Sequence, residues 1–279
     1  MTRSVRNELD TTEITVIGQR IVVDDRGSGG TPIVTIANVM DDGATWPAAW
    51  EPLLNSAGYR AVALHHRGTT DTVEGMADDF AAAIRGLGLD PALVVGYSQG
   101  AWITQALAHA HPDVVRGAVL LATTASPSRF VRLHWSALQE VERAVQAPAA
   151  KQALLLLTLL TPAELADDDL VEFVVAATTD GLAAITPEAT ERTLRSLHAC
   201  LDYVENSAGR LGSLRDVTVP CLVLSFEHDI LCPPSHGRAV ADAIPDASYV
   251  VVPGAGHAGA MSHADEVVDR ITTFFASLQ

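Results

Sequence analysis

The chain has 279 residues, of which 48% are hydrophobic and 5% aromatic, and its formal net charge is −16 at pH 7. This length and apolar content predict one globular domain with an aliphatic core, with or without an inserted lid. The acidic balance repels a phosphate backbone and an anionic membrane surface, so we expect neither nucleic acid nor a membrane as partner. A small molecule is the expected substrate.

The start of the chain and its cysteines point to a reducing compartment. Residues 1–10 are polar and charged, without the apolar segment of a secretory signal, and no apolar stretch is long enough to span a bilayer. Cys200, Cys221 and Cys232 cannot all pair, and their spacing matches no zinc site. We therefore expect a cytoplasmic protein with reduced thiols and no metal. The oligomeric state is not predicted.

Strand and helix patterns alternate through the first part of the chain. The first is a hairpin across 14–23, broken at Gly18. After it, strands are predicted at 33–37, 60–64, 92–96 and 116–122, and helices at 46–57, 73–87 and 99–110. Short apolar runs between helices are typical of parallel strands buried on both faces and joined by right-handed crossovers.

The alternation stops at about residue 126 and returns after residue 214. The intervening block is helical, most clearly at 149–160 and 188–204. Further strands are predicted at 217–225 and 248–252, and further helices at 235–243 and 264–277. We predict an α/β fold with a mostly parallel central sheet flanked by helices. Its core comprises 1–125 and 215–279, and 126–214 is an inserted helical lid over the carboxyl edge of the sheet, where open α/β sheets bind ligands. The alternative for this block is a structural domain without a role at the site.

A candidate nucleophile follows the predicted strand at 92–96. Gly96-Tyr-Ser98-Gln99-Gly100 fits G-x-S-x-G between a strand and a helix, the context in which this motif holds a serine in a sharp turn. The glycines let strand and helix approach closely. The Gln99 N–H then points at a developing oxyanion, at a helix N-terminus that favours negative charge. A plain Gly-Ser turn is the alternative.

A serine hydroxyl needs a base to remove its proton and an acid to orient that base. Proteins with this motif place the serine first, then the acid, then the histidine. Asp229 follows the strand at 217–225, and His257 follows the last predicted strand in PGAGH. We therefore predict Ser98, Asp229 and His257 as the catalytic residues. Glu227 is the alternative acid.

These pieces together resemble a known superfamily. GYSQG, a strand ending in EHD and followed by PP, and PGAGH look like the α/β-hydrolase superfamily over nearly the whole chain. The stretch 217–258 is most similar to aclacinomycin methylesterase-like esterases, which cleave a methyl ester on a polyketide. The resemblance implies an α/β-hydrolase fold, a serine hydrolase of secondary metabolism with a polyketide-like substrate, and no cofactor.

Two segments depart from the family pattern. The family usually has His-Gly after its third strand, where this chain has Asn38-Val39, and the next residue supplies the second oxyanion N–H. This alignment predicts an oxyanion hole from the N–H groups of Met40 and Gln99. We expect Asn38, Val39, Tyr97 and Trp135 to contact the substrate, and for Tyr97 and Trp135 the alternative is packing behind the site.

The second departure is His65-His-Arg-Gly-Thr-Thr70. His65 replaces an Asp of the family pattern and Thr70 replaces a Gly. In the family this segment braces the loops around the site, and we expect the same bracing role here.

Hydrolysis of a carboxylic ester or lactone through an acyl-enzyme is the leading functional hypothesis. Thioesters, and carbon–carbon bonds next to a ketone, remain possible substrates because the same triad serves them. One alternative is a cofactor-free perhydrolase or haloperoxidase-like enzyme with the same triad. Another is a non-hydrolytic binder or a cyclase, suggested by the missing His-Gly.

Overall fold

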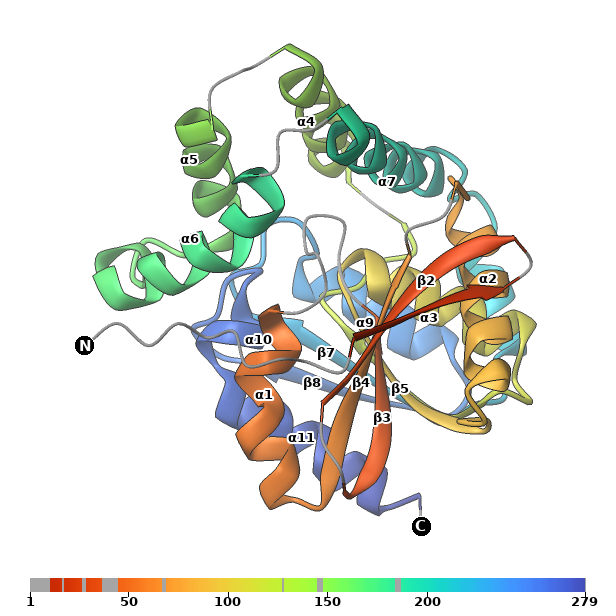
Figure 1. The fold of residues 1–279 in the computed structure, drawn as a ribbon. Coiled ribbons are helices and arrows are strands. Elements are labelled where there is room, and N and C mark those ends of the chain that lie inside the picture. Colours follow the sequence, from red (N-terminus) through yellow and green to blue (C-terminus); the bar gives the residue numbers. More distant parts are fainter. Residues whose placement is uncertain are drawn as a thin grey trace.

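The computed structural model describes residues 11–16, 18–26, 29–36, 45–66, 69–126, 128–144, 148–183 and 187–278. Within these ranges, eight strands form one sheet in the order β1-β2-β4-β3-β5-β6-β7-β8 (Figure 1). The strands are β1 (Thr11–Val16), β2 (Gln19–Arg26), β3 (Thr31–Ile36), β4 (Tyr59–His66), β5 (Ala92–Tyr97), β6 (Val115–Leu121), β7 (Cys221–Phe226) and β8 (Ala247–Val252). β2 pairs antiparallel with β1 and with β4, whereas the other neighbouring strands are parallel. The predicted hairpin and the mostly parallel sheet are confirmed.

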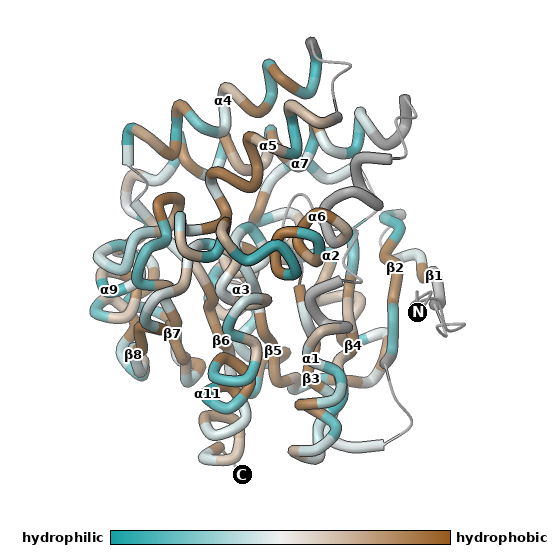
Figure 2. Tube along the Cα trace, turned by 90° about the vertical axis from the view of Figure 1, so that its left-hand side faces the viewer, coloured by the Kyte–Doolittle hydropathy of each residue, from teal (hydrophilic) through white to brown (hydrophobic). Residues whose placement is uncertain are grey.

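The central strands are covered on both faces. Every residue of β5 and of β7 is buried, as the continuous apolar runs of the sequence predict. Figure 2 shows apolar residues concentrated along these inner strands. β3 lies between β4 and β5, so the order of the strands reverses beside β5. Open α/β sheets bind ligands at such a reversal, outside the carboxyl ends of the strands.

Helices pack on the two faces of the sheet. They are α1 (Thr45–Ser56), α2 (Val73–Gly86), α3 (Gln99–Ala110), α9 (Pro234–Ala243), α10 (Gly259–Ser262) and α11 (Ala264–Ala276). α1 lies beside α11, and α2 lies beside α3 (Figure 1). α2 begins where the Thr72 side chain accepts a hydrogen bond from the Gly75 N–H at 3.2 Å, a standard N-cap.

Most predicted bounds agree with the structure to within one or two residues, but the hairpin predicted at 14–23 extends three residues further at each end, and one strand begins late. The strand predicted from residue 217 begins only at Cys221. Pro220 precedes it and has no N–H to donate to the sheet, while Leu214–Asp216 forms a 3-10 helix, η2. The four-residue helix α10 was not predicted, because so short an element shows no periodicity.

Between β6 and β7 the described chain is helical. We call residues 126–214 the helical insertion. It contains α4 (Arg129–Ala144), α5 (Pro148–Leu159), the 3-10 helix η1 (Glu164–Ala166), α6 (Asp168–Ala183), α7 (Pro187–Glu205) and α8 (Arg210–Ser213). Figure 2 shows α4, α5 and α7 above the sheet. The insertion contacts Gln99, two residues after β5, and Ala258 in the loop after β8, and these contacts lie at the carboxyl ends of the strands.

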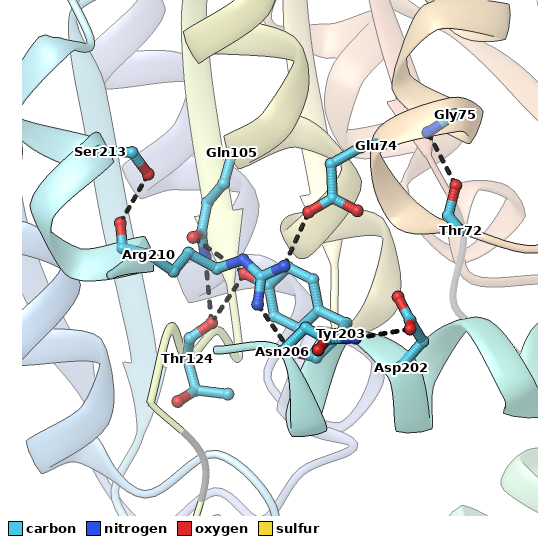
Figure 3. A network of polar contacts seen from close by, with 10 residues as sticks. All are labelled: Thr72, Glu74, Gly75, Gln105, Thr124, Asp202, Tyr203, Asn206, Arg210 and Ser213. Carbon is cyan, nitrogen blue, oxygen red and sulfur yellow. Dashed lines mark hydrogen bonds and ion pairs between the residues drawn. The ribbon is translucent and has the colours of Figure 1, made fainter. Parts of the chain in front are cut away.

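A polar joint ties the end of the insertion to the core (Figure 3). Arg210 donates to Glu74 of α2 at 2.7 Å and to the Tyr203 carbonyl at 2.6 Å, and its guanidinium lies 3.5 Å from the Tyr203 ring centre. The Tyr203 hydroxyl donates to Gln105 of α3 at 3.2 Å, and its ring stacks on Trp102 at 4.7 Å. Since cation–π contacts strengthen when desolvated, this joint stabilises the attachment of α7 to α3.

The structure also places the three cysteines and describes the character of the helices. Cys200, Cys221 and Cys232 are buried and unpaired, as expected for reduced thiols. Among the described helices, none combines the length and apolar character that crossing a membrane requires.

Candidate active site

Ser98 occupies a strained turn between β5 and α3. Its backbone angles are φ 57° and ψ −116°, which L-residues rarely adopt, at a cost of about 1–3 kcal/mol. Gly96 allows the turn: a Cβ there would lie 2.2 Å from the Gly100 carbonyl oxygen and 2.3 Å from the Thr104 hydroxyl. The glycine that precedes the serine by two positions is therefore required for the close approach of strand and helix.

His257 and Asp229 lie beside Ser98, although they come from distant parts of the sequence. His257 Nε2 is 3.1 Å from Ser98 Oγ, and His257 Nδ1 is 2.7 Å from Asp229 Oδ2. All three residues are 3% exposed. Because a carboxylate only accepts hydrogen bonds, Nδ1 donates to Asp229, which leaves Nε2 free to accept the serine proton.

Asp229 is itself held by the backbone. Its Oδ1 accepts the N–H groups of Leu231 and Cys232, each at 2.8 Å. These bonds leave Oδ2 directed at the imidazole. The alternative acid, Glu227, is half exposed and accepts the Gly254 N–H at 2.8 Å. Glu227 therefore supports the loop before His257 and does not orient the ring.

The loop that carries His257 is anchored on both sides of this residue. The Tyr97 hydroxyl donates to the His257 carbonyl at 2.5 Å. The preceding N–H, of Gly256, donates to Glu164 Oε2 at 3.2 Å, and the following N–H, of Ala258, donates to the Leu159 carbonyl at 2.9 Å. Two of the three anchors belong to the insertion.

Sequence reasoning had not singled out Glu164. Thr161-Pro-Ala-Glu164 fits the S/T-x-x-E pattern of a capping box, and this signal would have found the cap. It would not have found the contact with Gly256, 92 residues further along the chain.

The predicted oxyanion donors fall partly outside the described residues. The Gln99 N–H is at the first residue of α3, next to Ser98, and no described residue accepts a hydrogen bond from it. The Gln99 side chain bonds Ser196 of α7, with Nε2 donating to the carbonyl and Oε1 accepting from the hydroxyl. Met40, Asn38 and Val39 lie outside the described residues.

Tyr97 and Trp135, both expected at the substrate, are buried. Tyr97 is 1% exposed and its hydroxyl donates to the His257 carbonyl, which fits the packing alternative and a supporting role for the loop. Trp135 of α4 is 4% exposed and packs edge-on against Trp102 and His134. Its indole N–H has no hydrogen-bond partner among the described residues.

His134 lies next to Trp135 and near His257. Burial, with a smaller contribution from the charge of His257, lowers the pKa of His134 to about 4. The side chain is therefore neutral at pH 7, and it can offer a hydrogen bond to an uncharged oxygen without bringing a positive charge into the site.

The described residues of the segment at 65–70 contact α2. Asp79 of α2, itself buried, receives the Thr70 hydroxyl at 2.6 Å and lies 2.8 Å from His66 Nε2. Desolvation lowers the pKa of His66, and the contact with Asp79 opposes this effect. These contacts tie the end of β4 to α2.

One group of side chains has the spacing of metal ligands. Atoms of Asp229, Cys232 and His257 all lie within 4.8 Å of one another. Asp229 and His257 are already bonded to each other, and burial raises the pKa of the Cys232 thiol well above its usual range. The mutual hydrogen bond between Asp229 and His257 thus accounts for two of these three side chains without a metal ion.

Comparisons with known proteins agree with this architecture. Residues 37–264 match the family described as the alpha/beta hydrolase fold. A Mycobacterium tuberculosis protein with the provisional name non-heme bromoperoxidase BpoC is 34% identical over 267 residues, 93% of this chain and 98% of that protein. Its crystal structure has a TM-score of 0.81 at 32% identity and covers 95% of this chain and 98% of that one.

More distant relatives carry other names. RutD of Klebsiella pneumoniae, provisionally named a carbamate hydrolase, is 27% identical over 247 residues, 85% of this chain and 88% of that protein. A thermophilic esterase from Thermogutta terrifontis has a TM-score of 0.78 over 96% of this chain and 99% of that one, and at 24% identity this likeness concerns the fold alone. Because the family match spans most of the chain and BpoC covers nearly all of it, this chain belongs to the α/β-hydrolase family of enzymes.

Proposed function

We propose that this chain is a serine hydrolase that cleaves a carboxylic ester or lactone of a small organic substrate. The observation that carries the proposal is the chain of short contacts from Ser98 Oγ to His257 Nε2, at 3.1 Å, and from His257 Nδ1 to Asp229, at 2.7 Å. An unassisted serine hydroxyl is a poor nucleophile, and this arrangement supplies the base that activates it.

In the proposed reaction, Ser98 Oγ attacks the substrate carbonyl while its proton passes to His257 Nε2. Asp229 stabilises the resulting imidazolium. His257 then protonates the departing alcohol, which leaves an acyl group on Ser98. Water repeats the sequence with His257 as base, releases the acid and restores the serine. None of these steps needs a cofactor.

The tetrahedral oxyanion is proposed to bind the N–H groups of Gln99 and Met40. The Gln99 N–H supports this role because it lies at a helix N-terminus, next to the nucleophile, with no acceptor among the described residues. One such donor lowers a barrier by about 2.7–4 kcal/mol.

The helical insertion is proposed to act as a lid that shapes the substrate pocket. Trp135 remains a proposed substrate contact because its buried N–H lacks a described partner, and Asn38 and Val39 remain proposed contacts from the sequence. A neutral His134 beside aromatic rings suits an uncharged, largely apolar substrate with oxygen substituents. Such a substrate is compatible with the polyketide ester implied by the methylesterase resemblance.

A fluorophosphonate probe tests the activated serine directly. Folded wild-type protein should react stoichiometrically at Ser98, whereas Ser98→Ala and His257→Ala should not react. His228→Ala is the matched control: its side chain is 55% exposed and adjoins Asp229 without contacting the triad, so it should react like the wild type. Failure of the folded wild type to react, or reaction that persists in Ser98→Ala, would refute the proposal.

The provisional name of BpoC favours one further candidate, a cofactor-free perhydrolase. Here hydrogen peroxide replaces water in attacking the acyl-enzyme, which releases a peracid and restores Ser98. The peracid then oxidises bromide to hypobromous acid and returns to the carboxylic acid. Bromination that requires peroxide, a carboxylic acid and Ser98 would support this candidate. Its absence from an enzyme that hydrolyses p-nitrophenyl acetate would leave hydrolysis alone.

A non-hydrolytic binder or a cyclase on the same fold is the remaining alternative. It predicts that Ser98→Ala keeps the function. Hydrolysis predicts a loss of about 10⁴-fold or more in turnover, because the covalent step is removed.

A further inference from the structure

The N–H groups on both sides of His257 bind the helical insertion, while the carbonyls of the same two peptide groups accept from His228 and Tyr97 of the core. The Gly256 N–H donates to Glu164, and the Ala258 N–H donates to the carbonyl of Leu159. Both acceptors lie in the short stretch that runs from the last residue of α5, Leu159, to the first residue of η1, Glu164. The insertion therefore shares with the core the task of fixing the position of His257 between Asp229 and Ser98.

Glu164 is the side chain at the centre of this contact. It is 8% exposed, and both of its oxygens are occupied. Oε2 accepts the N–H of Thr161 at 2.8 Å and that of Gly256 at 3.2 Å, and Oε1 accepts the Ser262 hydroxyl at 2.6 Å. One carboxylate thus joins η1, the loop before His257 and the helix α10 behind it.

Helix capping accounts for only part of this arrangement. A capping box requires the reciprocal bonds between Thr161 and Glu164, and both are present. The bonds to Gly256 and Ser262 lie outside the cap. Gly256 also fits the contact closely, because a Cβ there would lie 2.7 Å from the Leu159 oxygen and 2.9 Å from Glu164 Oε2.

We propose that Glu164 is a positioning residue for the reaction, whose carboxylate, by binding Gly256 and Ser262, holds the imidazole of His257 within reach of Ser98. This inference rests on the proposed function. A displacement of about 1 Å at a reacting group is enough to cost about 100-fold in rate. A buried carboxylate that anchors the adjacent peptide restricts such displacement.

Three substitutions at Glu164 distinguish the effect of side-chain length from the effect of the negative charge. Glu164→Ala removes the acceptors and leaves two buried N–H groups unpaired. Glu164→Asp keeps the charge but withdraws the carboxylate by about 1.5 Å, the length of one carbon–carbon bond. Glu164→Gln loses the charge but keeps the reach: its amide oxygen can accept both N–H groups, and its NH₂ can donate to the Ser262 hydroxyl.

Glu142→Ala is the matched control. Glu142 lies in the same insertion, its side chain is 11% exposed, and it accepts from Lys151 at 2.8 Å. None of its described contacts involves the loop at 253–263. Glu142→Ala therefore removes a buried, bonded carboxylate and lowers stability without releasing His257.

For hydrolysis of p-nitrophenyl acetate by protein verified as folded, we expect kcat to fall about 100-fold in Glu164→Ala with KM nearly unchanged. Glu164→Asp should follow Glu164→Ala, Glu164→Gln should retain most of the activity, and Glu142→Ala should turn over like the wild type. The proposal is overturned if kcat in Glu164→Ala equals that of the wild type. It is equally overturned if Glu164→Asp is active and Glu164→Gln is not. The Asp and Gln pair decides the matter if Glu164→Ala does not fold.

An NMR measurement on His257 tests the positioning role independently of the proposed function. The Nδ1–H of His257, which donates to Asp229, should give a sharp downfield signal that broadens or disappears in Glu164→Ala and persists in Glu142→Ala and Glu164→Gln. This measurement needs no turnover. An inactive wild type with these signal changes would refute the hydrolase and leave the anchoring of His257 supported. An active enzyme whose signal is the same in all variants would refute the positioning role alone.

Discussion

His134 should make the stability of the fold depend on pH in a way that one substitution removes. The side chain is 8% exposed on α4, with its ring 5.3 Å from that of Trp135 and 6.0 Å from that of Phe130. Burial, followed by the charge of His257, lowers its pKa from 6.5 to about 4. Below pH 6.5 the unfolded chain binds more protons than the folded one, so stability is lost as the pH falls.

The size of the effect follows from the two pKa values. One unit of pKa difference corresponds to about 1.4 kcal/mol, so the full loss approaches about 3 kcal/mol near pH 4. Between pH 7 and pH 5 the same relation gives about 2 kcal/mol, because His134 is then still mostly neutral in the folded state and mostly charged in the unfolded state.

Urea unfolding at pH 7 and at pH 5 measures this change in the unfolding free energy. His134→Phe keeps an aromatic ring in the cluster and removes the titration. The fall in unfolding free energy from pH 7 to pH 5 should therefore be about 2 kcal/mol smaller than in the wild type. His198→Phe replaces an exposed histidine of the same insertion, and its pH dependence should match that of the wild type. An equal pH dependence in His134→Phe and the wild type would refute the reasoning.

Three further predictions concern packing and polar contacts. Gly96→Ala should lower the unfolding free energy by about 1–3 kcal/mol, because the added Cβ collides with the Gly100 backbone. Gly86→Ala adds its Cβ in open space and should not lower the unfolding free energy by this mechanism, so equal losses in calorimetry would contradict the reasoning. Tyr97→Phe leaves the buried His257 carbonyl without its donor and should cost about 1–3 kcal/mol in chemical denaturation, and an unchanged midpoint would argue against the anchor. In Arg210→Lys the lysine cannot both stack on Tyr203 and bind Glu74, so the unfolding free energy should fall by about 1 kcal/mol or more. Arg85→Ala removes an exposed ion pair with Asp113 and should lower the unfolding free energy less; the reverse order would contradict a stabilising role for the Arg210 contacts.

Local sequence patterns predicted the parts of the site that depend on local geometry. The apolar run of β5 and the glycines around Ser98 indicate a strand, a sharp turn and a helix, and the structure has these elements with Ser98 at a positive φ. The order of the candidate residues along the chain pointed to Asp229 and His257, and both lie within hydrogen-bonding reach of one another.

Contacts between distant segments could not be predicted in this way. Tyr97 was expected at the substrate because it adjoins Ser98, but the hydroxyl reaches a carbonyl 160 residues away. The bond from Gly256 to Glu164 likewise depends on how the insertion folds back over the sheet. Hydrophobic periodicity locates helices but does not specify which turn of a helix approaches which loop.

The contact between the insertion and the His257 loop limits how α/β hydrolases of this kind can be redesigned. Exchange of the whole segment 126–214 for that of a relative with another substrate range would also replace the Glu164 carboxylate and the residues that place the Leu159 carbonyl. If Glu164 positions His257 as proposed, such a chimera should lose turnover even when its new pocket binds the intended compound. Grafts that keep residues 159–164 and exchange only the helices around them separate pocket shape from the alignment of the general base.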